Sequence, residues 1–210
     1  MRTIKVVDGE YTIENEIKRS RFIATAKGEV GQDEADAFVK SVKKKYSDAT
    51  HNCYAYVADE LGNVARFSDD GEPGGTAGQP ILDVIKKQGL VRTAIVVTRY
   101  FGGIKLGAGG LVGAYSGAAS DVLKIAKIAT KKECKTVSFK TDYSTFANVN
   151  KFLMKAECKP LGFDYGDDVS GDVCVPLDIV ESFANDLSEV ASGKIEIEVG
   201  EQISYQSVEG

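Results

Sequence analysis

Two glycine-rich segments constrain the fold of this chain more than any other feature. They are SDDGEPGGTAG, residues 68–78, and GGIKLGAGG, residues 102–110. This density of glycine excludes regular secondary structure, so both segments are predicted to be loops. Between them lies TAIVVTRYF, residues 93–101, an apolar run of β-formers that predicts a central strand buried on both faces. A helical pattern follows each loop, one with Pro80 near its start and one that runs to about Lys127.

The rest of the first half mixes strand and helix patterns. Apolar spacing predicts a helix from Asp33 to Tyr46. Four short segments have the composition of strands: TIKVV (3–7), RFIATAKGEV (21–30), CYAYV (53–57) and NVARF (63–67). The resulting mixture of strands and helices predicts an α+β domain.

The second half has a cleaner pattern. Strands are predicted at 135–141, 159–166, 171–177 and 194–206, with helices at 143–157 and 178–191. This β-α-β-β-α-β order is that of a ferredoxin-like domain. We expect the domain boundary near residues 131–135, which divides the chain into domains 1–132 and 135–210.

Composition favours a globular protein with its own core. Hydrophobic residues make up 43% of the chain, but no apolar run approaches 18 residues, so no membrane partner is expected. The N-terminus lacks the apolar core of a signal peptide, and the four cysteines match no metal-binding spacing. We therefore expect a cytoplasmic protein with reduced thiols and no cofactor. His51 is the only histidine, which excludes any site built from several histidines.

Charge is distributed unevenly between the two halves. Residues 1–132 carry 20 Lys and Arg against 16 Asp and Glu, a net charge of +4. Residues 133–210 carry 6 against 15, a net charge of −9. A nucleic acid is therefore expected to meet the first half, because an acidic surface repels phosphates.

The second glycine-rich segment predicts an anion site. A helix that starts near Gly107 leaves backbone N–H groups unpaired at the positive end of its dipole. Lys105 and Arg99 are close enough in sequence to add charge-assisted contacts. The predicted ligand-binding groove consists of His51, Arg66, Arg99, Tyr100, Lys105, Gly107, Gly109 and Gly110. The alternative is that Gly109, Gly110, Gly113 and Gly117 only let the long helix pack closely on the sheet.

The first glycine-rich segment carries three carboxylates within four residues, Asp69, Asp70 and Glu72. Such a cluster can hold Mg²⁺ together with substrate phosphates. The alternative is a solvated turn, which aspartate favours. Likewise, His51 is either a hydrogen-bonding or acid–base residue of a site, or a structural histidine at a strand end.

Four aromatic residues of the first half have the ring systems that stack on nucleic-acid bases. They are Tyr54, Tyr56, Tyr100 and Phe101. Since they lie in apolar strands, the alternative for each is packing in the core.

The segment GQPILDVIKKQGLVRTAIVVTRYFGGIKLG, residues 78–107, resembles the signature of the IMPACT/YigZ family. HNCYAY and DDGEPGGTAG before it and AGGLVGAY after it resemble that signature too. The resemblance covers about the first 130 residues, and the second half is similar to the smaller domain of bacterial members. It implies an N-terminal domain like the ribosomal-protein and RNase PH-like α+β fold and a C-terminal domain like those of elongation factor G.

The resemblance also implies a role connected with translation. Eukaryotic relatives regulate translation initiation, and bacterial relatives are thought to bind nucleic acid. We therefore expect a translation-associated regulator that binds RNA or the ribosome rather than an enzyme. Two alternatives stay open: a Mg²⁺-dependent enzyme acting on a phosphorylated small molecule or nucleotide, and a protein-binding adaptor whose acidic C-terminal domain contacts a partner.

Overall fold

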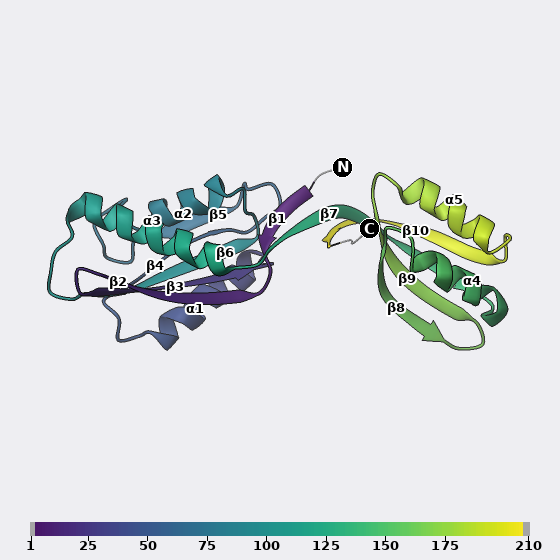
Figure 1. Ribbon diagram of the computed structural model, residues 1–210, viewed down its shortest axis with the longest axis horizontal. Coiled ribbons are helices and arrows are strands. Elements are labelled where there is room, and N and C mark those ends of the chain that lie inside the picture. The colour runs from purple at the N-terminus through teal and green to yellow at the C-terminus, as the bar shows by residue number, and fades with distance from the viewer. Residues whose placement is uncertain (1–2, 208–210) are drawn as a thin grey trace. The chain divides into compact units, whose positions relative to one another are not determined.

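The computed structural model describes residues 3–207 and divides the chain into two compact units. The first unit comprises Ile4–Ala129, and the second contains the chain after Ala129. The division falls within the long strand β7 (Ile128–Thr141), next to the residues 131–135 expected from the sequence. Both units combine strands and helices (Figure 1), which confirms the predicted α+β class.

An antiparallel sheet of five strands forms the centre of the first unit, in the order β2-β3-β6-β4-β5. Its strands are β2 (Glu10–Ile17), β3 (Ser20–Gly28), β4 (His51–Val57), β5 (Ala65–Ser68) and β6 (Thr93–Tyr100). The short strand β1 (Thr3–Val7) precedes them. Strand β6 is central and almost entirely buried, as its apolar sequence predicts. Strand β2 was not predicted, because alternating glutamates obscure its apolar positions.

Helices cover both faces of this sheet. Helix α1 (Gln32–Lys45) packs on one face, while α2 (Gly78–Lys87) and α3 (Gly107–Ile125) pack on the other. Side chains of β6 alternate between the two cores, since Ile95 and Val97 contact the α2–α3 side and Ala94 and Val96 the α1 side. This alternation decides which residues at the end of β6 share a face.

The second unit has the predicted β-α-β-β-α-β order of elements. Strand β7 is followed by α4 (Tyr143–Leu153), β8 (Lys159–Tyr165), β9 (Val169–Pro176), α5 (Val180–Val190) and β10 (Ile195–Gln206). The strands are antiparallel, in the order β10-β7-β9-β8. Val137 and Val173 of the sheet and Phe183 and Leu187 of α5 belong to one core.

Two further expectations concern cysteines and membranes. The four cysteines, Cys53, Cys134, Cys158 and Cys174, are buried and free, as expected for reduced thiols. Within residues 3–207, no helix combines the length and apolar character needed to cross a bilayer.

Candidate functional site

The loop before α2 is folded around the carboxylate of Asp69. Its Oδ1 accepts hydrogen bonds from the N–H groups of Ala77 (2.9 Å) and Gly78 (2.8 Å), and its Oδ2 accepts one from Gly75 N–H (2.9 Å). Burial works to raise the pKa of Asp69, but the three backbone hydrogen bonds outweigh it and hold the pKa below its ordinary value. The start of α2 is therefore already occupied by an anion of the protein itself.

The same junction requires glycine for steric reasons. A Cβ atom at Gly78 would lie 2.8 Å from backbone atoms of Ser68, at the end of β5. No larger residue fits there without displacing the main chain. The start of α2 is thus held directly against the sheet.

Asp70 fastens the loop to β4. Its Oδ2 accepts a hydrogen bond from the N–H of Asn52 (2.6 Å), and its Oδ1 lies 2.6 Å from Lys43 Nζ. Burial works to raise the pKa of Asp70, but these two contacts outweigh it and lower the pKa. The Asp70 carbonyl oxygen lies 2.8 Å from His51 Nδ1, and because a carbonyl can only accept, Nδ1 carries the proton.

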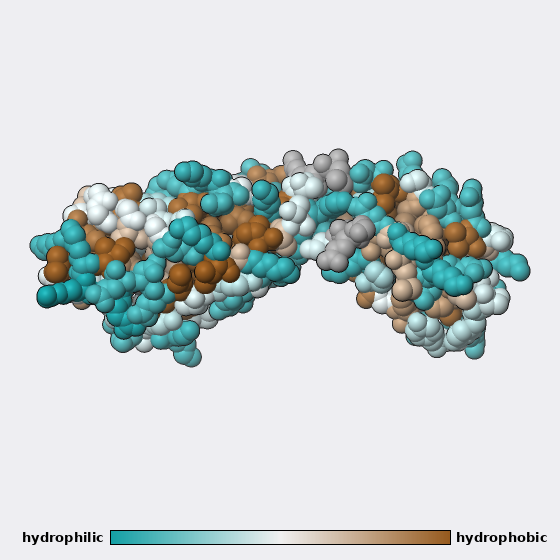
Figure 2. Space-filling model, viewed as in Figure 1, coloured by the Kyte–Doolittle hydropathy of each residue, from teal (hydrophilic) through white to brown (hydrophobic). Residues whose placement is uncertain are grey.

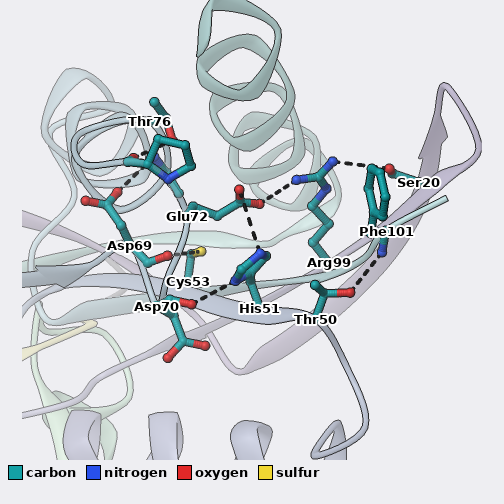
Figure 3. Close-up of polar contacts among 12 residues, drawn as sticks. Ser20, Thr50, His51, Cys53, Asp69, Asp70, Glu72, Thr76, Arg99 and Phe101 are labelled. Carbon is teal, nitrogen blue, oxygen red and sulfur yellow. Dashed lines mark hydrogen bonds and ion pairs between the residues drawn. The ribbon is translucent and has the colours of Figure 1, made fainter. Parts of the chain in front are cut away.

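Glu72 lies buried at the centre of the network drawn in Figure 3. Its Oε1 accepts hydrogen bonds from Arg99 Nη1 and from the Tyr115 hydroxyl, both at 2.7 Å. Burial raises the pKa of Tyr115, which keeps this hydroxyl protonated as a donor. Glu72 Oε2 lies 3.8 Å from His51 Nε2, which is too far for a hydrogen bond. The predicted site residues His51, Glu72 and Arg99 thus lie together, on the α2–α3 face of the sheet.

Cys53 belongs to the same network but has the properties of a core residue. Its Sγ donates a hydrogen bond to the Asp69 carbonyl oxygen (2.9 Å). Burial raises the pKa of its thiol to about 12, so the reactive thiolate is scarce at neutral pH.

The three carboxylates of the loop point to three separate sets of donors. Asp69 binds backbone amides, Asp70 binds Lys43 and Asn52, and Glu72 binds Arg99 and Tyr115. Across residues 3–207, no group of three or more His, Cys, Asp or Glu side chains is arranged to hold a metal ion. The arrangement therefore favours a structural role for the acidic loop over the Mg²⁺ site considered from the sequence.

Two predicted groove residues lie on the opposite face of the sheet, so the groove is not assembled as predicted. Arg66 Nη1 lies 3.5 Å from Asp36 Oδ2 of α1, and the Tyr100 hydroxyl donates a hydrogen bond to Asp48 (2.8 Å). The alternation of side chains along a strand explains the separation. Tyr100 directly follows Arg99 on β6, so the two side chains point to opposite faces.

Arg99 is also not the accessible cation that the sequence analysis expects. Its side chain is only 6% exposed, and its charge is paired with Glu72. The guanidinium contacts two aromatic rings, 5.5 Å from the ring centre of Phe22 and 5.3 Å from that of Phe101. Arg99 is therefore a buried, paired residue that packs at the end of β6.

We call the paired groups of Asp69, Asp70, Glu72 and Arg99 the closed network. The start of α3 is different, because it is exposed. Gly107, Ala108, Gly109 and Gly110 are exposed, no side chain caps the helix, and its first turn carries no acidic residue. Lys105 is exposed beside it and has no acidic partner in the described part of the chain. The predicted cradle of backbone amides is therefore accessible, with one of its two predicted cations.

The other described helices all have a carboxylate at their start. These are Asp33 and Glu34 for α1, Asp69 for α2, Asp142 for α4 and Glu181 for α5. A carboxylate there interacts favourably with the helix dipole, and those of Asp69 and Asp142 also accept hydrogen bonds from the first N–H groups. Helix α3 has no carboxylate at its start, so no acidic side chain of its first turn competes with an external anion.

Two cations that the sequence analysis missed lie in a turn next to Gly102, the residue after Phe101. Lys18 and Arg19 form the exposed turn between β2 and β3, and neither has an acidic partner within residues 3–207. A Cβ atom at Gly102 would lie 1.9 Å from the Arg19 carbonyl oxygen, so this turn lies directly against Gly102. The only sign of this turn in the sequence was the basic pair Lys18–Arg19 itself. The turn was not expected, because strand β2 before it was not predicted.

The glycines further along α3 do not serve close packing on the sheet. A Cβ atom at Gly109, Gly113 or Gly117 would meet no atom within 4 Å. Only Gly110 is confined, because its Cβ would lie 3.0 Å from Leu106 Cβ. The packing alternative is therefore wrong for three of the four glycines, which lie on the open side of the helix.

We call Lys18, Arg19, Lys105 and the amides of 107–109 the open helix start. Figure 2 shows pale and brown residues beside hydrophilic ones at the end of the first unit where α3 begins. Phe101 and Ile104 are 46% and 40% exposed in the loop that leads to α3. Apolar and cationic groups are thus both accessible around this loop.

Comparison with known proteins identifies the family of this chain. Residues 18–123 match the Impact N-terminal domain. The IMPACT family member YvyE of Bacillus subtilis (strain 168) is 37% identical over 193 residues, covering 92% of this chain and 88% of YvyE. The chain belongs to the IMPACT family. Another member, YigZ of Escherichia coli (strain K12), is 35% identical over 188 residues, covering 89% of this chain and 92% of YigZ.

A solved structure extends the similarity to the fold. It is described as the crystal structure of an hypothetical protein, shares 33% sequence identity and superposes with a TM-score of 0.64. The match covers 96% of this chain and 100% of that chain. The IMPACT domain match begins at Lys18 and contains both glycine-rich loops, so the closed network and the open helix start both lie within the family domain.

Proposed function

We propose that this IMPACT family protein is a translation-associated regulator that binds RNA through phosphates held at the open helix start. The observation that supports the proposal is the uncapped, exposed start of α3 beside Lys105, in a loop whose Gly102 lies against the Lys18–Arg19 turn. None of these three cations has an acidic partner within residues 3–207. Membership of the IMPACT family supports the connection with translation.

The chemistry of the open helix start suits phosphate oxygens. The first N–H groups of α3 point along the helix axis, and the helix dipole adds positive potential at the same place. Lys105 adds a mobile ammonium group, while Lys18 and Arg19 extend the positive surface towards Phe101. A chain of regularly spaced phosphates matches several separate cations better than a single small anion does.

The distribution of charge supports RNA binding by the first unit rather than the second. Residues 133–210 carry a net charge of −9 and repel a polyanion, whereas residues 1–132 carry +4. The loop carboxylates do not oppose binding strongly, because Asp70 and Glu72 are paired with Lys43 and Arg99.

The test uses the full-length protein and a fluorescent single-stranded RNA of about ten nucleotides, a length within the usual site sizes. Contacts from three cations predict that log K falls with log salt at a slope of about −2. Gly109→Asp places a carboxylate at the open helix start and should weaken binding roughly tenfold, because it competes with phosphate for the same N–H groups. No atom lies within 4 Å of the new Cβ, so the variant should fold.

Gly117→Asp is the matched control, since it makes the same change at another open position of α3. Its carboxylate lies about 12 Å further along the helix, beyond the screening length of about 8 Å at physiological salt. Equal loss of affinity in both variants, or binding that does not depend on salt, would refute a phosphate site at the helix start.

A role as a protein-binding adaptor is a second candidate, and the surface of the second unit favours it. Met154, Leu161 and Tyr165 are 81%, 49% and 59% exposed on an acidic unit that is not suited to RNA. Full-length protein carrying Met154→Glu should lose protein partners that remain bound after nuclease treatment, whereas Gly109→Asp should keep them. The opposite pattern would exclude this candidate.

A further inference from the structure

Resting on the proposed RNA-binding function, we infer that Phe101 is a stacking platform for a nucleobase and that the ligand is therefore a single-stranded nucleic acid. Phe101 differs from the other aromatic residues considered for this role. Tyr56 is fully buried, Tyr54 stacks on it at 6.2 Å, and Tyr100 lies on the α1 face. Phe101 alone among the four is on the α3 side of β6 with 46% of its surface exposed.

The main chain that carries the ring is held in place by hydrogen bonds. The N–H of Phe101 donates to Thr50 Oγ1 (3.0 Å), and the N–H of Gly102 donates to Ser20 Oγ (3.2 Å). Gly102 also lies against the carbonyl of Arg19 so closely that no side chain fits there. A ring held in place before binding loses little conformational entropy when a ligand stacks on it.

The inner side of the ring is occupied by a buried cation. The Arg99 guanidinium lies 5.3 Å from the centre of the Phe101 ring and 5.5 Å from that of the Phe22 ring. Because Glu72 binds Arg99, the guanidinium cannot turn away to meet a ligand phosphate. The buried Glu72–Arg99 pair thus supports the platform, with Phe101 lying over Arg99 at the end of the strand (Figure 3). A base that stacks on the outer face of Phe101 continues this series of flat groups.

The charges around Phe101 select the kind of flat ligand. Lys18 and Arg19 lie in the turn against Gly102, and Lys105 follows four residues after Phe101. The acidic groups nearby are engaged, since Glu72 is paired with Arg99 and Asp48 accepts from Tyr100 on the other face. A ligand that suits both the ring and the cations has a flat ring next to a negative charge, and a nucleotide combines the two. The strand must be single, because duplex bases are stacked on one another and present only their edges.

The experiment compares three probes of matched length: a single-stranded RNA, an abasic sugar–phosphate chain and inorganic polyphosphate. Stacking of one base predicts that RNA binds about 5- to 100-fold more tightly than the abasic chain. Phe101→Leu should remove this advantage and leave polyphosphate binding unchanged, while Phe101→Trp should keep it. Phe67→Leu is the matched control, because Phe67 is also 46% exposed in the first unit.

The outcomes separate this inference from the proposed function. If the three probes bind equally and Phe101→Leu has no effect, the site binds anions only and the platform is wrong while the helix-start site stands. If Phe101→Leu weakens all three probes alike, the ring has a structural role and the inference also fails. Duplex RNA that binds as tightly as the single strand would overturn it too. If the wild-type protein binds no probe, the proposed function fails and the platform with it.

Discussion

The two glycine-rich loops of the first unit lead into neighbouring helices but end in opposite states. In the first loop, Asp69 folds back on the N–H groups at the start of α2 and occupies them. In the second loop no carboxylate is present, and the start of α3 remains exposed beside Lys105. Glycine leaves the N–H groups of a helix start accessible, and a nearby carboxylate decides whether they are hydrogen-bonded within the protein.

The loops also differ in why glycine is present. At Gly78 the main chain of β5 leaves no space for a Cβ atom, whereas at Gly109 nothing lies within 4 Å. The first glycine is explained by the fold. The second lowers helix stability without a packing benefit, which is consistent with keeping a surface free for a ligand.

The largest effect is expected from breaking the ion pair between Glu72 of the first loop and Arg99 of β6, the strand that leads into the second loop. Glu72→Gln leaves the Arg99 charge buried without a counter-charge, and should lower the free energy of unfolding by about 3 kcal/mol or more. The signal of His51, the only histidine, reports unfolding of the first unit by NMR during urea titration. Glu60→Gln, which breaks the more exposed pair with Arg92, should change the free energy by less than about 1 kcal/mol.

Combining Glu72→Gln with Arg99→Met removes both charges and should recover part of the lost stability. If the double variant is less stable than Glu72→Gln alone, the cause is not an uncompensated buried charge.

Replacing glycine by alanine at the two helix starts should change stability by smaller amounts, and in opposite directions. Gly78→Ala should destabilise the protein by about 1–3 kcal/mol, because the new Cβ overlaps Ser68. Gly109→Ala should stabilise it by about 0.5–1 kcal/mol, because alanine is the better helix former and space is free. Urea unfolding of the two variants measures both changes. Similar effects at the two positions would show that the loops do not differ as described.

Asp69→Asn tests the occupied helix start and should cost about 1 kcal/mol, which is typical for the loss of a charged cap. Because the pKa of Asp69 is lowered in the folded state, its stabilising effect is present above the unfolded pKa of about 3.9 and is lost as the pH falls. The wild-type protein should therefore lose more stability than the variant between about pH 5 and pH 3. An unchanged acid dependence would mean that Asp69 does not hold the loop through its charge.

The smallest effect is expected from giving α3 the carboxylate that α2 has. Gly109→Asp should raise the free energy of unfolding by about 0.3–1 kcal/mol through the helix dipole, beyond any gain seen with Gly109→Ala. Raising the salt concentration should reduce that additional gain. A loss of stability relative to Gly109→Ala would indicate that the helix start is not electropositive.

Much of the fold followed from local patterns in the sequence. The buried strand β6, the three helices of the first unit and the β-α-β-β-α-β order of the second were all predicted, because hydrophobic periodicity reports which faces are buried. Strand β2 escaped detection because its glutamates make it resemble a solvated loop. It pairs with β3 and packs against the α2–α3 core, and the packing is a contact between segments far apart in the sequence.

The candidate site was predicted less completely. Local sequence predicts an anion site at the amides of Gly107 and Gly109 and the adjacent Lys105, because a glycine-rich helix start is a feature of consecutive residues. Arg66 and Tyr100 belong to the predicted groove but lie on the α1 face of the sheet. Side chains alternate between the two faces along each strand, which puts Arg66 and Tyr100 on the α1 face. Which face a given residue takes depends on how the strands pair.

The sequence by itself determined the alternation of strands and helices, the two glycine-rich loops, the charge difference between the halves and membership of the IMPACT family. Only the tertiary structure decided that Glu72 neutralises Arg99, that Asp69 occupies the start of α2, and that the Lys18–Arg19 turn lies against Gly102. The physical reason is that periodicity and glycine content act within a few residues along the chain. Ion pairs and exposed rings depend on where distant segments meet, since residues 18–20 and 99–102 are about 80 positions apart yet in contact.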